Sequence, residues 1–447
     1  MNKTSIIGLA ITILVVGIIA YLISDIDTPC DKVKCEKRLG LDAGQSDSLI
    51  SIYDTKNAPE IDTINVFIEA SLSMDGYVKN KNSIFNLVVT NIDNNINNNG
   101  IAYHFIGGAG ESTTILPVTR EQINTLHNGS FDRIRHKNAN ARRNTDTNCM
   151  IDSILSRWAQ KTDDVSILIT DAVFSPNGEG DLPNHASTIQ SGIKKTIKQA
   201  LNDNPNFSVL TYRLKSDFNG TYYLCDNSEK YINQKRPFYV WIFGERAKLT
   251  HIKQNLDESW NGYRFSNETD STFCFMASGA VSGNLLSGYV PYEVLNKKHL
   301  FHIVGAEYNR DGICVVKIKA NMGSIPYNED YLTDSTNYHT NKNYYIVNSI
   351  TPISENNNGY THELSIHVKG KPREEIPNNT EIEISLLAPY FNTDILNSIN
   401  DTTNSSNDVP TNTTFMIKPL IQGIYEAYGL TNESNRKKIA TFKVFIN

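Results

Sequence analysis

The chain has 447 residues, which is enough for two or three domains. Its formal net charge of -6 and its pI of about 6.0 provide no bulk positive field, so a nucleic-acid partner is not expected. The mean hydropathy of -0.36 is typical of a soluble body and excludes a chain made mostly of membrane spans.

One segment departs from this soluble composition. Residues Ile6–Ile23 contain no charge, and an apolar run of about 18 residues or more is typical of a membrane span. A cleaved signal peptide is the alternative, but its apolar region would be shorter, and no small-x-small cleavage site follows Ala20. We therefore predict a single-pass transmembrane anchor over residues 5–24 and a stalk over residues 25–59.

The side of the membrane that the body faces stays open. Only Lys3 precedes the span and four basic residues follow it, which favours a cytoplasmic body. A short basic N-terminus before a long body is instead the usual form of a signal anchor that exports the body. Cys30 and Cys35 would form a disulfide only in an oxidising compartment. We expect the exported, extracytoplasmic topology. The four basic residues are Lys32, Lys34, Lys37 and Arg38.

Residues 60–258 alternate strands with helices. Apolar runs predict strands buried on both faces, and apolar residues at i, i+4 spacing predict amphipathic helices. The alternation predicts a doubly wound, mostly parallel α/β sheet, and Asn219-Gly220 predicts a hairpin turn. The predicted strands are Thr63–Ile68, Ile101–Ile106, Val165–Ile169, Phe207–Leu214 and Phe238–Phe243. The predicted helices are Ser83–Asn98, Cys149–Trp158, Ser187–Leu201 and Glu245–Leu256.

Beyond about residue 270 the pattern changes to short alternating runs separated by Asn, Gly and Pro. This pattern predicts an antiparallel, β-sandwich-like domain over residues 270–447. Within it, Pro389–Thr414 is expected to be a mobile loop and Ile417–Tyr428 a helix. The predicted strands are His299–Val304, Ile313–Ala320, Tyr344–Ile350, Thr361–Val368, Glu381–Leu387 and Lys437–Ile446.

Side-chain oxygens follow the predicted strands of the α/β domain. Glu69, Ser71 and Ser73 come at alternate positions after the first strand. Asp171 ends the third strand, and Thr145 precedes a helix. Open α/β sheets bind ligands outside the carboxyl ends of their strands, and crowded hard oxygens are the ligands that Mg²⁺, Mn²⁺ or Ca²⁺ prefers. These five residues therefore supply oxygens to one edge of the predicted sheet.

The three segments resemble the motifs of the von Willebrand factor A domain family, which are D-x-S-x-S, a Thr in a G-G-T-x-T-like loop, and T-D-G. The matching residues are Glu69–Ser73, Arg143–Thr147 and Thr170–Ala172, and the resemblance covers residues 60–256. It implies a metal-ion-dependent adhesion site in which the serines and the Thr bind a divalent cation. The carboxylates would act directly or through water, and a partner protein would supply a further carboxylate.

The matched motifs depart from the family pattern at three places. Glu69 stands where the family has Asp, Ala172 where it has Gly, and Arg143-Asn144 where it has Gly-Gly. The longer Glu69 side chain could push its carboxylate into or past the metal. A nearby Asp75 or Asp146 could compensate.

Together these features predict a membrane-anchored, non-enzymatic protein that binds a protein partner, in adhesion or as a scaffold, through a metal-dependent vWA-like domain. The β-rich domain would act as a spacer or second contact. The alternative is a cytoplasm-facing adaptor for an ATPase or a defence-type complex. A metal-dependent hydrolase is less favoured, because G-x-S-x-G is absent and no His lies in a motif with Asp and Ser. His104 lies inside a predicted strand and is expected to be a core or face residue.

Overall fold

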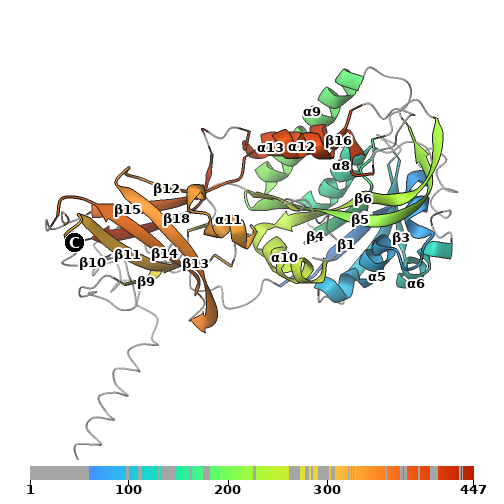
Figure 1. Ribbon diagram of the computed structural model, residues 1–447. Coiled ribbons are helices and arrows are strands. Elements are labelled where there is room, and N and C mark those ends of the chain that lie inside the picture. Colours follow the sequence, from blue (N-terminus) through green and yellow to red (C-terminus); the bar gives the residue numbers. More distant parts are fainter. Residues whose placement is uncertain are drawn as a thin grey trace, which may run out of the picture.

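The computed structural model describes residues 60–446 with gaps, and these residues form two bodies that lie side by side (Figure 1). One is an α/β body and the other is built from antiparallel sheets. No helix among the described residues is long and apolar enough to cross a bilayer. The predicted anchor and stalk lie outside the described residues. The gaps are 97–99, 109–112, 129–130, 132–145, 161–163, 175–181, 225–227, 261–271, 277–280, 283–284, 290–301, 304–307, 321, 324, 326, 358–359, 373–375, 377–379, 391–392, 403–410, 432–433 and 435.

A seven-stranded mixed sheet forms the centre of the α/β body, with the order β3-β2-β1-β4-β6-β5-β7. β1 lies in the middle, is buried along its whole length, and pairs in parallel with β2 and β4. This confirms a mixed α/β fold around a buried first strand. The strands are β1 (Ile64–Glu69), β2 (Ile101–Gly107), β3 (Thr114–Val118), β4 (Val165–Thr170), β5 (Phe207–Tyr223), β6 (Glu229–Glu245) and β7 (Thr272–Met276).

Among the described strands of this sheet, only β2, β1 and β4 pair in parallel, although β5 points in the same direction as these three. β5 turns straight back into β6 without a crossover helix, so the two strands must be antiparallel, and β6 takes the place beside β4. The turn lies between Leu224 and Ser228, whose backbone N–H and carbonyl are 3.0 Å apart. The prediction of a turn at Asn219-Gly220 is wrong, because both residues lie inside the β5–β6 ladder.

Helices cover both faces of this sheet (Figure 1). α5 and α10 lie on one face, and α8 and α9 lie on the other. Ser83 caps α5, because its Oγ accepts a hydrogen bond from the N–H of Asn86 at 3.2 Å. The helices of this body are α5 (Ile84–Ile96), α6 (Arg120–Asn124), η3 (Leu126–Asn128), α8 (Thr147–Ala159), α9 (Leu182–Asp203) and α10 (Arg246–Trp260).

The second body contains a four-stranded sheet, β13-β14-β11-β9, and a five-stranded sheet in which β18 pairs with β15, β10 and β8. Alternate residues of β11 are buried, as expected for a strand that covers a core with one face. Its elements are β8 (Val281–Ser282), β9 (Leu285–Tyr289), β10 (His302–Ile303), β11 (Ile313–Ala320), α11 (Glu329–Thr333), η6 (Ser335–Asn337), β12 (Tyr338–Thr340), β13 (Tyr345–Asn357), β14 (Tyr360–Lys369), β15 (Thr380–Leu387) and β18 (Lys438–Ile446).

Part of the range expected to form the β-rich domain belongs to the α/β body instead. β7 extends the first sheet, and α13 packs along α9 (Figure 1). The reason is the apolar face of α13, which the α/β body buries. The segment expected as a mobile loop also contains short regular elements. These returning elements are α12 (Thr393–Ile399), β16 (Asn400–Asp401), β17 (Thr414–Phe415) and α13 (Ile417–Tyr428).

Candidate functional site

The carboxyl ends of β1 and β4 form the edge of the sheet at which the sequence places its oxygen-bearing side chains. The two strands are parallel neighbours, and their register pairs Ile68 with Ile169. Glu69 and Thr170 therefore finish their strands side by side, and the residues after them start from the same edge. We call this part of the molecule the β1–β4 edge.

Ser71, Ser73 and Asp171 meet at the β1–β4 edge. The Oγ atoms of Ser71 and Ser73 lie 2.8 Å apart, and the Ser73 hydroxyl donates a hydrogen bond to the Asp171 carboxylate. All three side chains are buried, with exposed fractions of 4%, 9% and 2% in that order. The structure thus brings together three of the five predicted ligands from two strands that are far apart in sequence.

The chain after β1 is more regular than its sequence indicates. A 3-10 turn, η1 (Leu72–Met74), leads straight into a short helix, α4 (Asp75–Val78). The buried hydroxyl of Tyr77 in α4 donates a hydrogen bond to the carbonyl of Pro237 in β6 at 2.6 Å. The backbone that carries the two serines is therefore fastened to a neighbouring strand.

Asp171 is a carboxylate in a low-dielectric environment. Burial raises the pKa of Asp171 above its ordinary value, because the charged form loses its water. Three contacts act in the opposite direction: the Val173 N–H at 3.0 Å, the Ser73 hydroxyl and the positive charge of Arg236. Burial outweighs them, so this carboxylate gains from any further positive charge.

Glu69 lies at the same edge, and its carboxylate bonds to the end of β4. The Thr170 hydroxyl donates a hydrogen bond to Glu69 and accepts one from the Ala172 N–H at 2.8 Å. These two hydrogen bonds hold the backbone in an unfavourable conformation, because Ala172 has a φ of 54°, in the left-handed region. Ala172 is the residue matched to the glycine of T-D-G, and glycine adopts this conformation without steric cost.

Thr145, the remaining predicted ligand, lies outside the described residues. The helix that follows it begins with Thr147, and Asp146 caps that helix. The Asp146 carboxylate accepts hydrogen bonds from the N–H groups of Asn148 at 2.9 Å and Cys149 at 3.3 Å. Asp146, which we considered as a substitute ligand, thus satisfies the first turn of α8.

Arg236 is the residue of this edge that sequence reasoning missed. It is 1% exposed, and its guanidinium carbon lies 4.2 Å from the centre of the Tyr222 ring. The guanidinium donates to the Tyr77 hydroxyl, and its Nη2 atom lies 3.5 Å from the carbonyl oxygen of Thr413. Its positive charge faces Asp171 closely enough to lower the pKa of that carboxyl.

The electrostatics of this cluster favour a charged Arg236. Burial by itself would lower the pKa of Arg236, but Tyr222, Tyr77 and Asp171 raise it above its ordinary value. Burial likewise raises the pKa of Tyr222 to about 12. The two phenols are therefore neutral near pH 7, and Asp171 is the acidic group that faces Arg236.

A sequence signal for Arg236 did exist. The residue directly precedes Pro237 and the apolar run Phe238–Phe243. A strand antiparallel to β4 begins at the edge where β4 ends, so the residue before that run belongs at the β1–β4 edge. The antiparallel direction of β6 was not foreseen, and the residue was therefore not considered.

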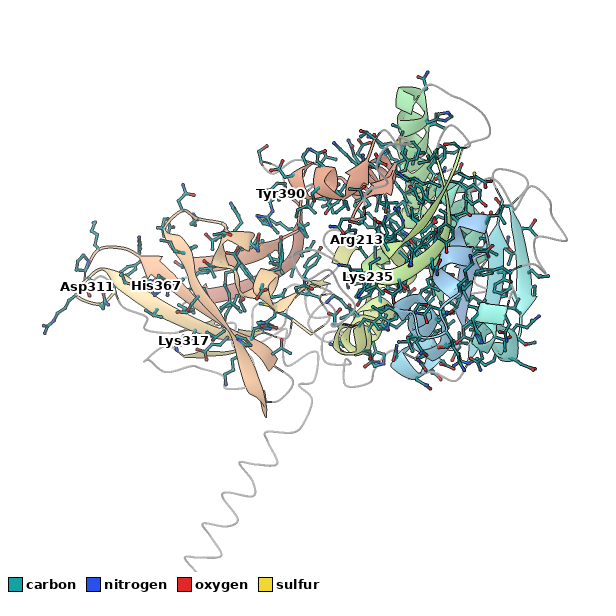
Figure 2. All side chains as sticks on the ribbon, turned by 45° about the vertical axis from the view of Figure 1, so that its right-hand side comes forward. Arg213, Lys235, Asp311, Lys317, His367 and Tyr390 are labelled. Carbon is teal, nitrogen blue, oxygen red and sulfur yellow. The ribbon has the colours of Figure 1, made fainter. Side chains whose placement is uncertain are left out.

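A returning segment also reaches the sheet, on the face that carries α8 and α9. Arg213 of β5 is fully buried and donates to the carbonyl of Asn412 (Figure 2). The Tyr239 hydroxyl of β6 donates to Oγ1 of Thr414 at 3.1 Å. Residues 412–414 thus contact the strands that bear Arg213 and Arg236.

The side-chain oxygens at the β1–β4 edge suit a divalent cation in part. Ser71, Ser73 and Asp171 offer three converging hard oxygens, which suits Mg²⁺ or Mn²⁺. Within the part of the chain described, no three His, Cys, Asp or Glu side chains group as a metal site would. A cation here would therefore depend on hydroxyl ligands, with Glu69 bonded to Thr170. Ser71, Ser73 and Asp171 fit a hard cation, but Arg236 already supplies positive charge to the Asp171 carboxylate.

His104 lies on the sheet away from these groups. Its Nε2 atom is 2.7 Å from Oδ1 of Asn65, and its ring stacks on Phe67 with 5.0 Å between the ring centres. This confirms that His104 is a buried face residue.

No family model, curated protein or solved structure matches this chain.

Proposed function

We propose that this chain is a membrane-anchored, non-enzymatic protein whose vWA-like α/β body binds a protein partner at the β1–β4 edge. The observation that supports it is the convergence of Ser71, Ser73 and Asp171 on hydrogen bonds to one another. Two hydroxyls and one carboxylate form a set of hard oxygen ligands of the kind that Mg²⁺ prefers. Binding accounts for such a set more simply than hydrolysis does.

The proposal includes a divalent cation, Mg²⁺ or else Mn²⁺ or Ca²⁺. Ser71, Ser73 and Asp171 would hold it, with Thr145 and Glu69 contributing as in the family that the sequence resembles. When bound, the cation supplies an open coordination position for a carboxylate of the partner protein. The side chains of this chain fix its place and exclude bulk water, since all three are buried.

The test is a pull-down with the purified 447-residue chain, with Mg²⁺ or with EDTA. The partner should be recovered in Mg²⁺ and lost in EDTA, and Ser71→Ala should lose it in both. Ser385→Ala is the matched control, because Ser385 is an equally buried serine in β15 of the other body. Recovery of the same partner by Ser71→Ala and in EDTA would exclude the metal-dependent mode.

The proposed topology is a single-pass anchor over residues 5–24 with an extracytoplasmic body. Cys30 and Cys35 lie close after the span, so an impermeant thiol reagent, applied after reduction, should label them in intact cells. Cys314 is a buried internal control that stays unlabelled until the protein is unfolded. Labelling only after lysis would favour the alternative, a cytoplasm-facing adaptor, to which the basic residues after the span point.

A further inference from the structure

We propose that Arg236 takes the place of the cation while the β1–β4 edge is closed, and that a divalent cation binds Ser71, Ser73 and Asp171 only when the β5–β6 hairpin moves Arg236 away. This inference rests on the proposed cation site and adds a residue that controls it.

The first observation is that the hairpin covers the edge. β4 ends at Thr170, opposite Tyr239, whereas β5 continues to Tyr223 and β6 begins at Glu229. The outer half of the hairpin therefore extends past the end of β4 and curves over the α/β body (Figure 1). This half carries Arg236.

The second observation is that the hairpin packs directly on the helical turn that follows the two serines. The ring of Phe218 stands edge-on to Tyr77, with 4.9 Å between the ring centres. Gly220 lies so close to Gly76 that a Cβ atom on Gly220 would come within 2.7 Å of the Gly76 Cα. The closed arrangement is thus specified by aromatic packing and by two glycines whose backbones touch.

The third observation is that several protein groups contact the buried guanidinium of Arg236. Tyr222 presents its ring face, Tyr77 its hydroxyl and Thr413 its carbonyl, so the guanidinium replaces its lost water with oriented dipoles. Asp171 then provides the opposite charge.

These observations make the cation and Arg236 competitors. The carboxylates of Asp171 and Glu69 can balance two positive charges at most, and a buried charge without a counter-charge is strongly disfavoured. A divalent cation beside the guanidinium would leave excess positive charge in a buried space. Ser71, Ser73 and Asp171 are also too deeply buried for a partner's carboxylate to reach them while the hairpin is in place. Opening the hairpin removes both obstacles. Hairpin opening, cation binding and partner binding are therefore linked equilibria.

The test measures Mn²⁺ binding to the purified 447-residue chain by electron paramagnetic resonance, without any partner. We expect Arg236→Gln to bind Mn²⁺ about 5- to 150-fold more tightly than the wild type, the usual range of coupling between two sites. Arg236→Lys keeps the charge and should stay near the wild type. Arg213→Gln is the matched control, a buried arginine on the neighbouring strand, and should also bind as the wild type does.

A second variant guards against misfolding of Arg236→Gln, which circular dichroism would detect. Phe218→Ala keeps Arg236 but loosens the hairpin on Tyr77, and it too should tighten Mn²⁺ binding. Equal Mn²⁺ affinity in the wild type and in the folded variants would overturn the role of Arg236 and leave the cation site standing. Absence of binding in all of them would overturn the cation site itself, and this inference with it.

Discussion

Gly423 of α13 lies directly against Ile193 of α9. A Cβ atom placed on Gly423 would come within 2.3 Å of Cγ2 of Ile193 and within 2.5 Å of the backbone oxygen of Gln190. The two helices can approach this closely only because the glycine has no side chain. At the next turn, Lys194 donates a hydrogen bond to the Glu426 carboxylate at 2.7 Å, which lowers the pKa of Glu426. The contact fastens the returning segment to the α/β body.

Gly423→Ala should therefore lower the free energy of unfolding by about 1–3 kcal/mol, the usual cost of overpacking. The added methyl meets the backbone of α9, which cannot move aside as a flexible side chain would. Urea unfolding followed by circular dichroism measures the change. Lys195→Ala, at an exposed position of α9, should stay within about 0.5 kcal/mol of the wild type. Equal stability of Gly423→Ala would contradict the close helix contact.

Ala172→Gly should raise the free energy of unfolding by about 0.5–1 kcal/mol. Relief of the left-handed conformation is worth about 1–2 kcal/mol, and the extra freedom of glycine in the unfolded chain offsets part of it. Ala70→Gly is the control, since Ala70 is buried just after β1 and does not have a positive φ. Ala70→Gly should be less stable than the wild type. A loss of stability in Ala172→Gly as well would contradict the positive φ of Ala172.

The core strands and their order along the chain could be predicted from sequence, because an apolar run that needs burial on both faces is a local property. β11 begins and ends where its alternation predicts. The direction of β6 could not be predicted in this way. It depends on the turn after Leu224, whereas the stronger local signal, Asn219-Gly220, lies inside the ladder.

The candidate site could be predicted in part for the same reason. Ser71, Ser73 and Asp171 each follow a buried strand, and parallel neighbours bring such residues to one edge. The bond from Thr170 to Glu69 depends on the β1–β4 register, which no local pattern encodes. Arg236 comes from a strand whose direction was not foreseen.

Asp164, at the start of β4, should make stability depend on pH. Burial alone would raise the pKa of Asp164, but hydrogen bonds from Lys248 and from the N–H groups of Thr63 and Asp62 lower it below its ordinary value. The Lys248 Nζ atom lies 2.6 Å from one carboxylate oxygen. A carboxyl whose pKa is lower in the folded state stabilises the fold above its unfolded pKa of about 4, and this contribution is lost as the pH falls through the folded value.

Asp164→Asn should therefore cost about 1–2 kcal/mol near pH 7, as expected for a charge-assisted hydrogen bond that is partly exposed. The difference from the wild type should shrink below about pH 4. Urea unfolding at a series of pH values measures it. Asp203→Asn, at the exposed end of α9, serves as the control and should change stability by less than about 0.5 kcal/mol. A cost that does not vary with pH would refute the assignment to the charged carboxylate.

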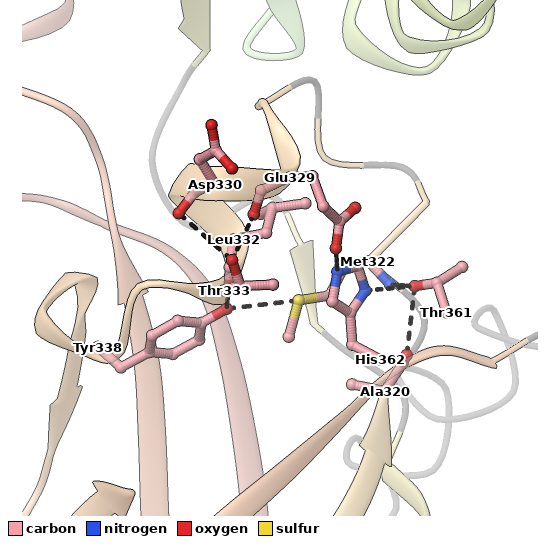
Figure 3. Close-up of polar contacts among 9 residues, drawn as sticks. All are labelled: Ala320, Met322, Glu329, Asp330, Leu332, Thr333, Tyr338, Thr361 and His362. Carbon is pink, nitrogen blue, oxygen red and sulfur yellow. Dashed lines mark hydrogen bonds and ion pairs between the residues drawn. The ribbon is translucent and has the colours of Figure 1, made fainter. Parts of the chain in front are cut away.

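The hydroxyl of Thr361 links Met322 to the buried His362 near α11 (Figure 3). Oγ1 of Thr361 accepts the Met322 N–H at 2.8 Å and lies 2.8 Å from Nδ1 of His362, whose Nε2 lies 2.9 Å from the Glu329 carboxylate. The Thr361 hydroxyl also lies 3.4 Å from the carbonyl oxygen of Ala320, so this one oxygen contacts Met322, His362 and Ala320.

Thr361→Val should lower the free energy of unfolding by about 1–3 kcal/mol, because it removes a hydrogen-bond partner from both Met322 and His362. Thr351→Val, on the exposed side of the neighbouring strand β13, is the matched control and should be near neutral. Urea unfolding compares the two variants, and similar costs would show that the network adds no stability.

The return of α13 to the α/β body also determines when each part of the molecule can finish folding. A growing chain is released from its N-terminus, so α9 leaves the ribosome long before the helix that covers it. β15 likewise waits for β18, which is its partner in the middle of the sheet. Each body is therefore completed only after its last element has been synthesised, and until then the nascent chain exposes apolar surface of the kind that chaperones bind.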